Sequence, residues 1–255
     1  MMPQEPEESQ ESQESRHNHG VTATAAVGTS TSAGSTAPVK DELDGSPLLR
    51  DVLGEALPKM EMFHGKLQEE GELRGLIGPR ELPRLWERHI LNSAALAPFI
   101  EKLLSDSKAS TYSVADIGSG AGFPGIVLAA MFPSVSFSLI ETMERRVEWL
   151  DEVVKDLALD NVTVIRARAE EVIGARYFDA VTCRAVAPMT KLSHWMLPLL
   201  KSGGTFVALK GRSAQTEIDK AAKEIRKEHG VSPQVHEAPV GEGLESTYVV
   251  TIRKR

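Results

Sequence analysis

The sequence predicts an α/β protein, in which a mostly parallel sheet is covered by helices on both faces and preceded by a small helical segment. Two observations predict this class. Beyond residue 112, short apolar or β-branched runs alternate with helix-length segments, as in sheets built from strand–helix–strand units. Between residue 48 and about residue 104, apolar residues instead recur at helical spacing.

Six strands are expected, within residues 114–117, 137–141, 162–166, 178–184, 205–210 and 248–253. Ligands of parallel sheets bind at the carboxyl ends of the strands. The residues that end or follow these strands are therefore the first candidates for a site, and they are Gly118, Glu141, residues 166–170, Arg184 and Lys210.

The chain divides into three segments. Residues 46–110 are expected to form the helical segment, in which Pro58 kinks or restarts a helix, and residues 111–255 the sheet domain. Residues 1–45 hold almost no large apolar side chain, so we expect a disordered tail that folding and activity do not require. This tail carries 8 acidic and 2 basic residues of a chain with net charge −7. The nearly neutral remainder is compatible with a nucleic-acid partner.

The single cysteine, Cys183, excludes internal disulfides and a cysteine-cluster zinc site, and no metal site is expected. It lies inside an apolar strand, where cysteine behaves as a small buried hydrophobe. No apolar run is long enough to span a membrane, and the chain does not begin with a signal-peptide pattern. A cytosolic protein is therefore expected.

The most informative segment is the loop after the first strand, Asp116-Ile-Gly-Ser-Gly-Ala-Gly-Phe-Pro-Gly125. Read from Gly120 it matches the G-x-G-x-x-G pattern of dinucleotide-binding proteins, whose pyrophosphate lies at a helix start with free N–H groups. Read from Asp116 it matches the acidic-Gly-x-Gly-x-Gly loop of S-adenosylmethionine (AdoMet) enzymes. The second reading is favoured, because Gly118 already closes the strand and Pro124 has no N–H to donate.

Glu141 ends the second strand, 23 residues past Gly118. A carboxylate there can accept hydrogen bonds from both ribose hydroxyls of an adenosine. The alternative is that Glu141 only caps the following helix, expected over residues 144–159.

Four further motifs carry a resemblance to a known family. They are Leu85-Trp-Glu-Arg-His-Ile-Leu-Asn-Ser93, Arg166-Ala-Arg-Ala-Glu-Glu171, Cys183-Arg-Ala-Val-Ala187 and Leu209-Lys-Gly211. Together with the glycine loop, they resemble the RsmG (GidB) family over about residues 48–255. These enzymes are class I, Rossmann-like AdoMet-dependent methyltransferases that make 7-methylguanine in small-subunit (16S) ribosomal RNA. The resemblance implies the same fold, cofactor and reaction here.

The resemblance implies cofactor roles for Gly118, Phe123, Ala169, Glu170 and Arg184, which add to the loop glycines and Glu141. The predicted cofactor-binding set is Gly118, Gly120, Gly122, Phe123, Glu141, Ala169, Glu170 and Arg184. The predicted RNA-facing set is Arg88, His89, Asn92 and Lys210. Asn92 stands where many relatives have Asp. For Arg88 and His89, an equal alternative to RNA contact is that their helix only packs on the domain. Trp86 of the same helix is expected to be buried. For Lys210, the alternative is a solvent-exposed side chain at a strand end that contacts no RNA.

Guanine N7 has an in-plane lone pair that is unprotonated at neutral pH, so the implied reaction needs in-line alignment and no catalytic acid or base. The target is expected in an unstacked RNA loop, within a small subunit or an assembly intermediate, and the enzyme is expected to be a monomer. Three alternatives remain: a dinucleotide-dependent oxidoreductase, a non-catalytic AdoMet- or RNA-binding module, and a cytosine-C5 enzyme with Cys183 as nucleophile. The last is disfavoured, because that chemistry usually needs paired cysteines.

Overall fold

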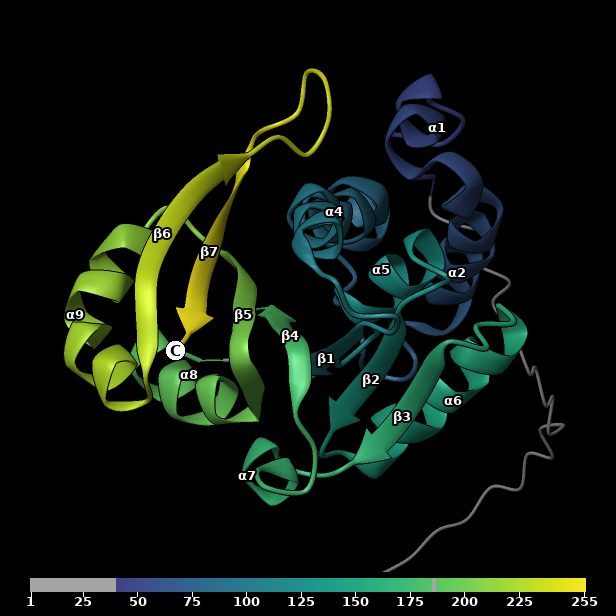
Figure 1. The fold of residues 1–255 in the computed structure, drawn as a ribbon. Coiled ribbons are helices and arrows are strands. Elements are labelled where there is room, and N and C mark those ends of the chain that lie inside the picture. The colour runs from purple at the N-terminus through teal and green to yellow at the C-terminus, as the bar shows by residue number, and fades with distance from the viewer. Residues whose placement is uncertain (1–39, 185–186) are drawn as a thin grey trace, which may run out of the picture. The chain divides into compact units, whose positions relative to one another are not determined.

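The computed structural model describes residues 40–184 and 187–255, which belong to one compact unit. Within these residues a sheet of seven strands has the order β3-β2-β1-β4-β5-β7-β6 (Figure 1). The strands are β1 (Ser113–Ile117), β2 (Ser136–Glu141), β3 (Val162–Arg166), β4 (Phe178–Arg184), β5 (Leu200–Lys210), β6 (Gly230–Ala238) and β7 (Thr247–Lys254). The predicted α/β class is confirmed.

The first five strands are parallel, and β7 pairs antiparallel with both β5 and β6. β1 lies in the middle, where Asp116 is opposite Leu139 of β2 on one side and Thr182 of β4 on the other. This register aligns the carboxyl ends of β1, β2 and β4, so the segments that follow them meet at one edge of the sheet.

The strand absent from the sequence-based prediction is β6. It is an edge strand that contains Pro233, Ser232 has a positive φ of 50°, and its register shifts between Val231 and Gln234. Proline and irregular pairing are tolerated at a sheet edge, because one side of the strand needs no partner. The sequence of β6 therefore lacks the apolar pattern by which the other strands were predicted.

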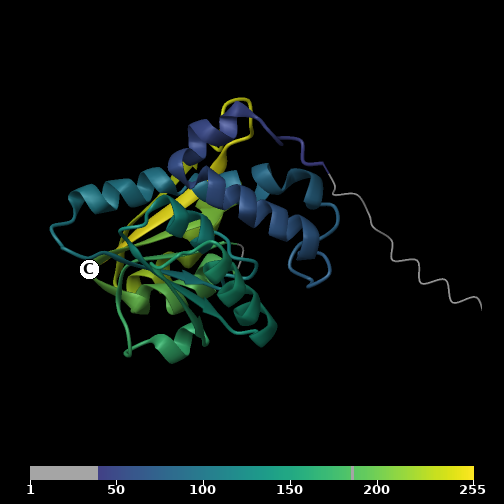
Figure 2. The same cartoon turned by 90° about the vertical axis from the view of Figure 1, so that its right-hand side faces the viewer.

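Helices cover both faces of the sheet, as predicted. The α-helices are α1 (Pro47–Leu53), α2 (Leu57–Glu70), α3 (Asn92–Ala94), α4 (Ala97–Asp106), α5 (Gly125–Met131), α6 (Glu144–Asp156), α7 (Ala169–Val172), α8 (Met189–Met196) and α9 (Ala214–Lys227). Residues of α1, α2, α4, α5 and α6 share one core with one face of the sheet. Residues of α7, α8 and α9 share a second core with the other face. In Figure 2 the blue N-terminal helices lie above the sheet.

Shorter helical turns connect these elements, and they are η1 (Gly54–Ala56), η2 (Leu82–Arg84), η3 (Trp86–Leu91) and η4 (Leu197–Leu199). Pro58 lies in the first turn of α2, so the expected restart of the helix is confirmed. η3 is a π-helix, a rare form that is frequent at functional sites. Trp86 is 2% exposed, which confirms that it belongs to the core.

Residues 1–39 of the predicted tail (residues 1–45) lie outside the described residues. The last residues of the tail pack against the helices. Asp41 is fully buried, and its Oδ2 accepts hydrogen bonds from the Trp86 backbone N–H at 3.1 Å and from His64 Nε2 at 3.3 Å. Asp44 Oδ1 accepts one from Trp86 Nε1 at 3.0 Å. The folded part therefore begins before Ser46, which corrects the boundary drawn from composition.

Within residues 40–184 and 187–255, no helix has both the length and the apolar character needed to cross a membrane.

Candidate functional site

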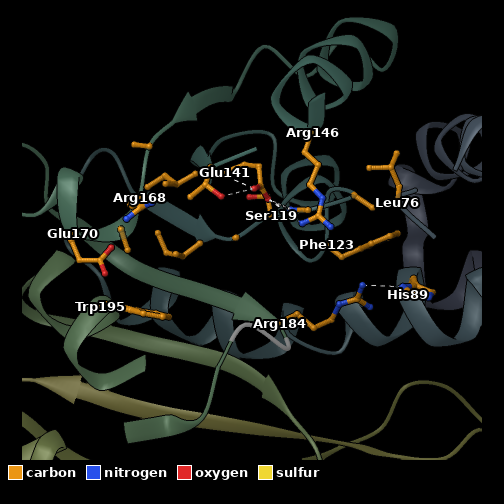
Figure 3. Close-up of a pocket in the computed structure, with 18 of the residues that line it drawn as sticks. Leu76, His89, Ser119, Phe123, Glu141, Arg146, Arg168, Glu170, Arg184 and Trp195 are labelled. Carbon is orange, nitrogen blue, oxygen red and sulfur yellow. Dashed lines mark hydrogen bonds and ion pairs between the residues drawn. The ribbon is translucent and has the colours of Figure 1, made fainter. Parts of the chain in front are cut away.

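A pocket of about 620 Å³ opens at the carboxyl ends of β1 to β4 (Figure 3). Its lining comes from the glycine loop, the β2 end, the first turn of α6, the turn before α7, the β4 end, α8, η3 and the segment after α2. The lining residues are Leu76, Ile77, His89, Ile117, Gly118, Ser119, Gly120, Ala121, Phe123, Ile140, Glu141, Thr142, Arg146, Ala167, Arg168, Ala169, Glu170, Arg184 and Trp195. All but one of the eight residues predicted to bind the cofactor line this pocket.

The exception is Gly122, which has a packing role. A Cβ at Gly122 would lie 2.8 Å from Ile126 and 3.1 Å from Phe63, and its φ is 114°. Gly118 and Gly120 also have positive φ values, of 70° and 58°, which glycine adopts at little cost. The three glycines therefore let the loop turn sharply and bring its backbone to the pocket.

The start of α5 does not offer the free N–H groups that a helix N-terminus was expected to provide. Gly122 and Phe123 donate to the carbonyl oxygen of Ser119, and Ile126 donates to that of Gly122. Gly125 donates to Asp116 Oδ2 at 3.0 Å, and Pro124 has no N–H. These donors are satisfied within the chain, so this helix start is a poor cradle for a pyrophosphate. That observation disfavours the dinucleotide interpretation of the loop.

Asp116 and Gly125 lock the loop to the sheet. Asp116 is fully buried, and this burial raises the pKa of its carboxyl group to about 7. A Cβ at Gly125 would lie 2.6 Å from Asp116 Oδ2 and 2.3 Å from a methyl group of Leu139. Only glycine fits here, because any side chain would push helix α5 away from β1 and β2.

Glu141 holds the loop from the other side. Its Oε2 accepts a hydrogen bond from the Gly120 N–H at 2.9 Å, and its Oε1 accepts from the N–H groups of Thr142 and Met143 at 2.8 and 3.0 Å. The side chain is nearly buried yet lines the pocket. The carboxylate thus orders the turn between β2 and α6, and it does not cap the helix, because no side chain caps α6 at Met143. Its place at the pocket is compatible with the ribose role, which stays a prediction.

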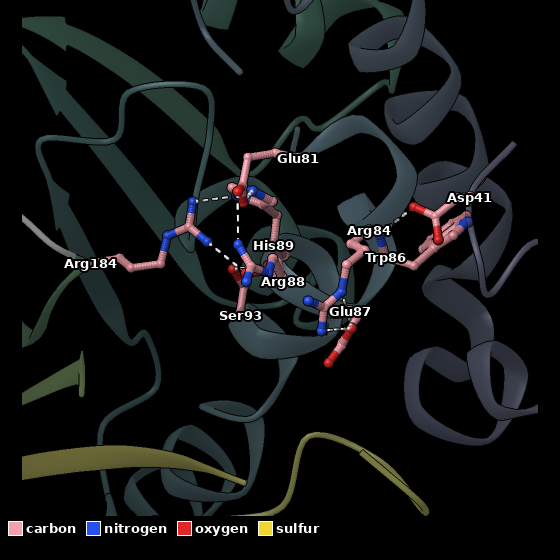
Figure 4. Close-up of polar contacts among 9 residues, drawn as sticks. All are labelled: Asp41, Glu81, Arg84, Trp86, Glu87, Arg88, His89, Ser93 and Arg184. Atoms are coloured by element: carbon pink, nitrogen blue, oxygen red, sulfur yellow. Dashed lines mark hydrogen bonds and ion pairs between the residues drawn. The ribbon is translucent and has the colours of Figure 1, made fainter. Parts of the chain in front are cut away.

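The opposite wall is a chain of contacts from Glu81 through His89 to Arg184 (Figure 4). Glu81 Oε2 lies 3.0 Å from His89 Nε2, and His89 Nδ1 lies 2.9 Å from Arg184 Nη2. Burial, and then the Arg184 charge, lower the pKa of His89 to about 4, so its neutral ring accepts from Arg184 at Nδ1 and donates to Glu81 at Nε2. The guanidinium lies 4.7 Å from the centre of the Phe123 ring.

These contacts separate the four residues that were predicted to face RNA. His89 lines the pocket instead. Arg88 is half exposed and pairs with Glu81 Oε1 at 2.8 Å, while its carbonyl oxygen accepts from Arg184. Asn92 and Lys210 line a second cavity that adjoins Arg184. The Lys210 side chain is 9% exposed and paired with Glu217. The alternative prediction, that Lys210 is a solvated residue at the strand end, is therefore wrong.

Two lining residues with long side chains, Arg146 and Trp195, were not predicted from the sequence, whereas Arg168 lies within the candidate range 166–170. Arg146 Nη1 lies 3.9 Å from Glu141 Oε2, and Arg168 and Trp195 lie near Glu170 (Figure 3). Arg146 could have been found from its place one turn into the helix after Glu141. Trp195 gave no such signal, because it lies on an amphipathic helix whose residues read as core.

The strand order, the antiparallel β7 and the glycine-loop pocket define the chain as a class I AdoMet-dependent methyltransferase. The same fold occurs in the methyltransferase domain of METTL16, with a TM-score of 0.53 at 16% identity over 77% of this chain and 79% of that one. The chain belongs to the GidB family, rRNA small subunit methyltransferase G, whose model matches residues 56–242.

Proteins named ribosomal RNA small subunit methyltransferase G are similar to this chain over most of their length. The one from Bifidobacterium adolescentis is 54% identical over 243 residues, which are 85% of this chain and 97% of that protein. The one from Corynebacterium glutamicum strain R is 46% identical over 213 residues, 82% of this chain and 91% of the other. The resemblance inferred from the motifs is confirmed.

Proposed function

We propose that this protein transfers a methyl group from AdoMet to N7 of one guanine in a loop of 16S ribosomal RNA. The observation that supports this most is the pocket, which joins the glycine loop, Glu141, the turn before α7 and Arg184 in a chain of this family. Its volume of about 620 Å³ lies within the ~300–1,000 Å³ that is typical of small-ligand sites.

The residues present fit AdoMet. Gly118 and Phe123 would lie at its methionine end, where the Arg184 guanidinium can donate to a carboxylate. Arg184 has five N–H groups, of which two have the partners described above, so others remain for a ligand. The Glu141 carboxylate would accept from ribose hydroxyls, and the Ala169–Glu170 turn would contact the adenine. AdoMet, when bound, supplies an electrophilic methyl group.

The chain's own task is to orient the reactants, because the N7 lone pair needs no base. Alignment of this kind accounts for roughly 7–11 kcal/mol of a barrier in well-oriented reactions. Cys183 does not fit the role of a nucleophile: it is 1% exposed within β4, and burial raises the pKa of its thiol to about 12. His89 does not fit the role of a general base, because Arg184 and Glu81 occupy both ring nitrogens.

The substrate we propose is the RNA within a small ribosomal subunit or an assembly intermediate, modified in the cytoplasm by a monomeric enzyme. The target guanine must unstack from the adjacent bases to enter the site, and a nucleotide in an RNA loop can do this at low free-energy cost.

The test is methyl transfer to small subunits from a strain without the modification. After incubation with isotope-labelled AdoMet, the RNA is digested and the labelled nucleoside identified by mass spectrometry. We expect 7-methylguanosine, and recovery of 5-methylcytidine or N6-methyladenosine would contradict the proposal. AdoMet and its demethylated product should raise the melting temperature, whereas NAD(H) should not. A rise with NAD(H) alone would favour the oxidoreductase.

A further inference from the structure

A second cavity, of about 280 Å³, lies beside the cofactor pocket and shares one residue of its lining, Arg184. We call it the side cavity; its lining residues are Asn92, Arg184, Leu209, Lys210, Gly211, Glu217 and Thr247. They come from the ends of β4 and β5, the start of β7, and helices α3 and α9. At just under the ~300 Å³ where drug-sized pockets begin, the cavity suits a single flat ring system.

The side cavity contains a partly buried ion pair. Lys210 Nζ lies 2.7 Å from Glu217 Oε2, and their side chains are 9% and 26% exposed. Lys210 also donates to the carbonyl oxygen of Ala187 at 3.0 Å. A partly buried pair of this kind adds little stability, because desolvation of the two charges and screening by solvent offset their attraction. Stability alone therefore does not explain why the pair is here.

Both charges, and a neighbouring amide, have hydrogen-bonding capacity left. An ammonium has three donors, and among the described residues Lys210 uses two. Glu217 accepts from Lys210, from the Met189 N–H at 3.2 Å and from Ser213 Oγ at 3.3 Å, which leaves lone-pair sites on a carboxylate that holds about four. Asn92 Oδ1 is buried with no partner in the described part of the chain.

The cavity thus offers a donor and acceptors side by side. A phosphate group fits poorly, because the Glu217 carboxylate would repel it. A base edge with both acceptors and donors fits well. Guanine presents, in order around its ring, the acceptors N7 and O6 and then the N1–H and N2–H donors.

We propose that the side cavity receives the guanine that is methylated, with N7 directed past Arg184 toward the cofactor pocket, O6 beside Lys210, and the N1–H and N2–H groups beside Glu217. This inference rests on the proposed function. Adenine would place an amino group against the Lys210 ammonium and an unprotonated N1 against the Glu217 carboxylate. The ion pair thereby rejects adenine as well as binding guanine.

The experiment compares, for each protein variant, the methylation rates of two substrates that differ only in the target base. Small subunits are assembled in vitro with guanine or hypoxanthine at the target position, since hypoxanthine lacks only the 2-amino group. Single-turnover methylation rates give a guanine-to-hypoxanthine ratio, which does not depend on the folded fraction. We expect a ratio of about 10 or more for the wild type, and a ratio near unity for Glu217→Met, which removes the acceptor oxygens.

Lys210→Met is the second variant, measured on guanine and 6-thioguanine, whose sulfur is a weaker acceptor than O6. It should lose the preference for guanine that the wild type shows. The matched control is Lys201→Gln, which removes an ion pair with Asp179 at the opposite end of the same strand β5 and should keep both wild-type ratios. Calorimetry should show that AdoMet affinity is retained in all three variants.

Ratios that stay at the wild-type value in both Glu217→Met and Lys210→Met would overturn the assignment of the side cavity, as would a wild type that does not discriminate. Either result would leave the proposed function standing, because the guanine substrate is still methylated. A wild type that methylates none of the subunits would instead refute the proposed function and this inference with it.

Discussion

Two shortened chains test where the folded part begins. Residues 1–39 carry no apolar pattern, so a protein that starts at Lys40 should melt like the full chain. A protein that starts at Ser46 loses Asp41 and Asp44, and with them the carboxylate partners of the Trp86 N–H, Trp86 Nε1 and His64 Nε2.

The expected loss follows from these three bonds. Hydrogen bonds to charged groups contribute about 1.5–3 kcal/mol each, and water replaces part of that once the covering segment is gone. A loss of about 3 kcal/mol lowers the melting temperature of a chain of this size by ~6–12 °C. In the protein that starts at Lys40, Asp41→Ala should reproduce most of the loss, because it leaves buried donors unpaired. The reasoning is refuted if the two shortened proteins melt within about 2 °C of each other.

Three further predictions concern the pocket and its surroundings. Glu141→Ala should weaken AdoMet binding about 10–100-fold in calorimetry, because ribose acceptors and the anchors of the loop are lost, while Glu144→Ala, at an exposed neighbour, should not. Cys183→Ser should stay active in methyl transfer at a stability cost of ~1–3 kcal/mol for burying a hydroxyl; a covalent RNA adduct on Cys183 would contradict this. His89 has a folded pKa of about 4 against about 6.5 unfolded, so the unfolded chain binds the extra proton and the stability from the neutral ring is lost as pH falls through that window. The stability gap between wild type and His89→Gln in denaturant titrations should shrink by ~3 kcal/mol from about pH 7 to about pH 4; a constant gap would show that the His89 environment is misassigned. Because Asp116 titrates in the opposite sense, only this difference isolates His89.

The strands could be predicted where their own residues carry a β pattern. β4 has the predicted bounds because it is buried on both faces and is nearly a continuous apolar run. β3 also has the predicted bounds, although it is a partly exposed edge strand, because β-branched residues recur along it. β6 could not be predicted, since its pairing is supplied by β7 and its own residues, with Pro233 among them, are polar or irregular.

The same distinction applies to the site. Gly118, Glu141, Ala169 and Arg184 end or follow strands of known direction, so topology alone brings them to one edge. The direction of His89 depends on Arg184, a residue 95 positions away, and on the wider turn of the π-helix η3, which alters the faces that an α-helical wheel assigns. Residue spacing within one segment does not contain that information.

The contact between Arg184 and η3 has a consequence for synthesis. A chain emerges from the ribosome amino end first, so Glu81 and His89 are made long before β4. Until then the ring of His89 has no guanidinium beside it, and the glycine loop has no opposite wall. The cofactor pocket is thus completed by β4, which is synthesised late. A nascent or truncated chain that ends before Arg184 contains the glycine loop but lacks the opposite wall of the pocket.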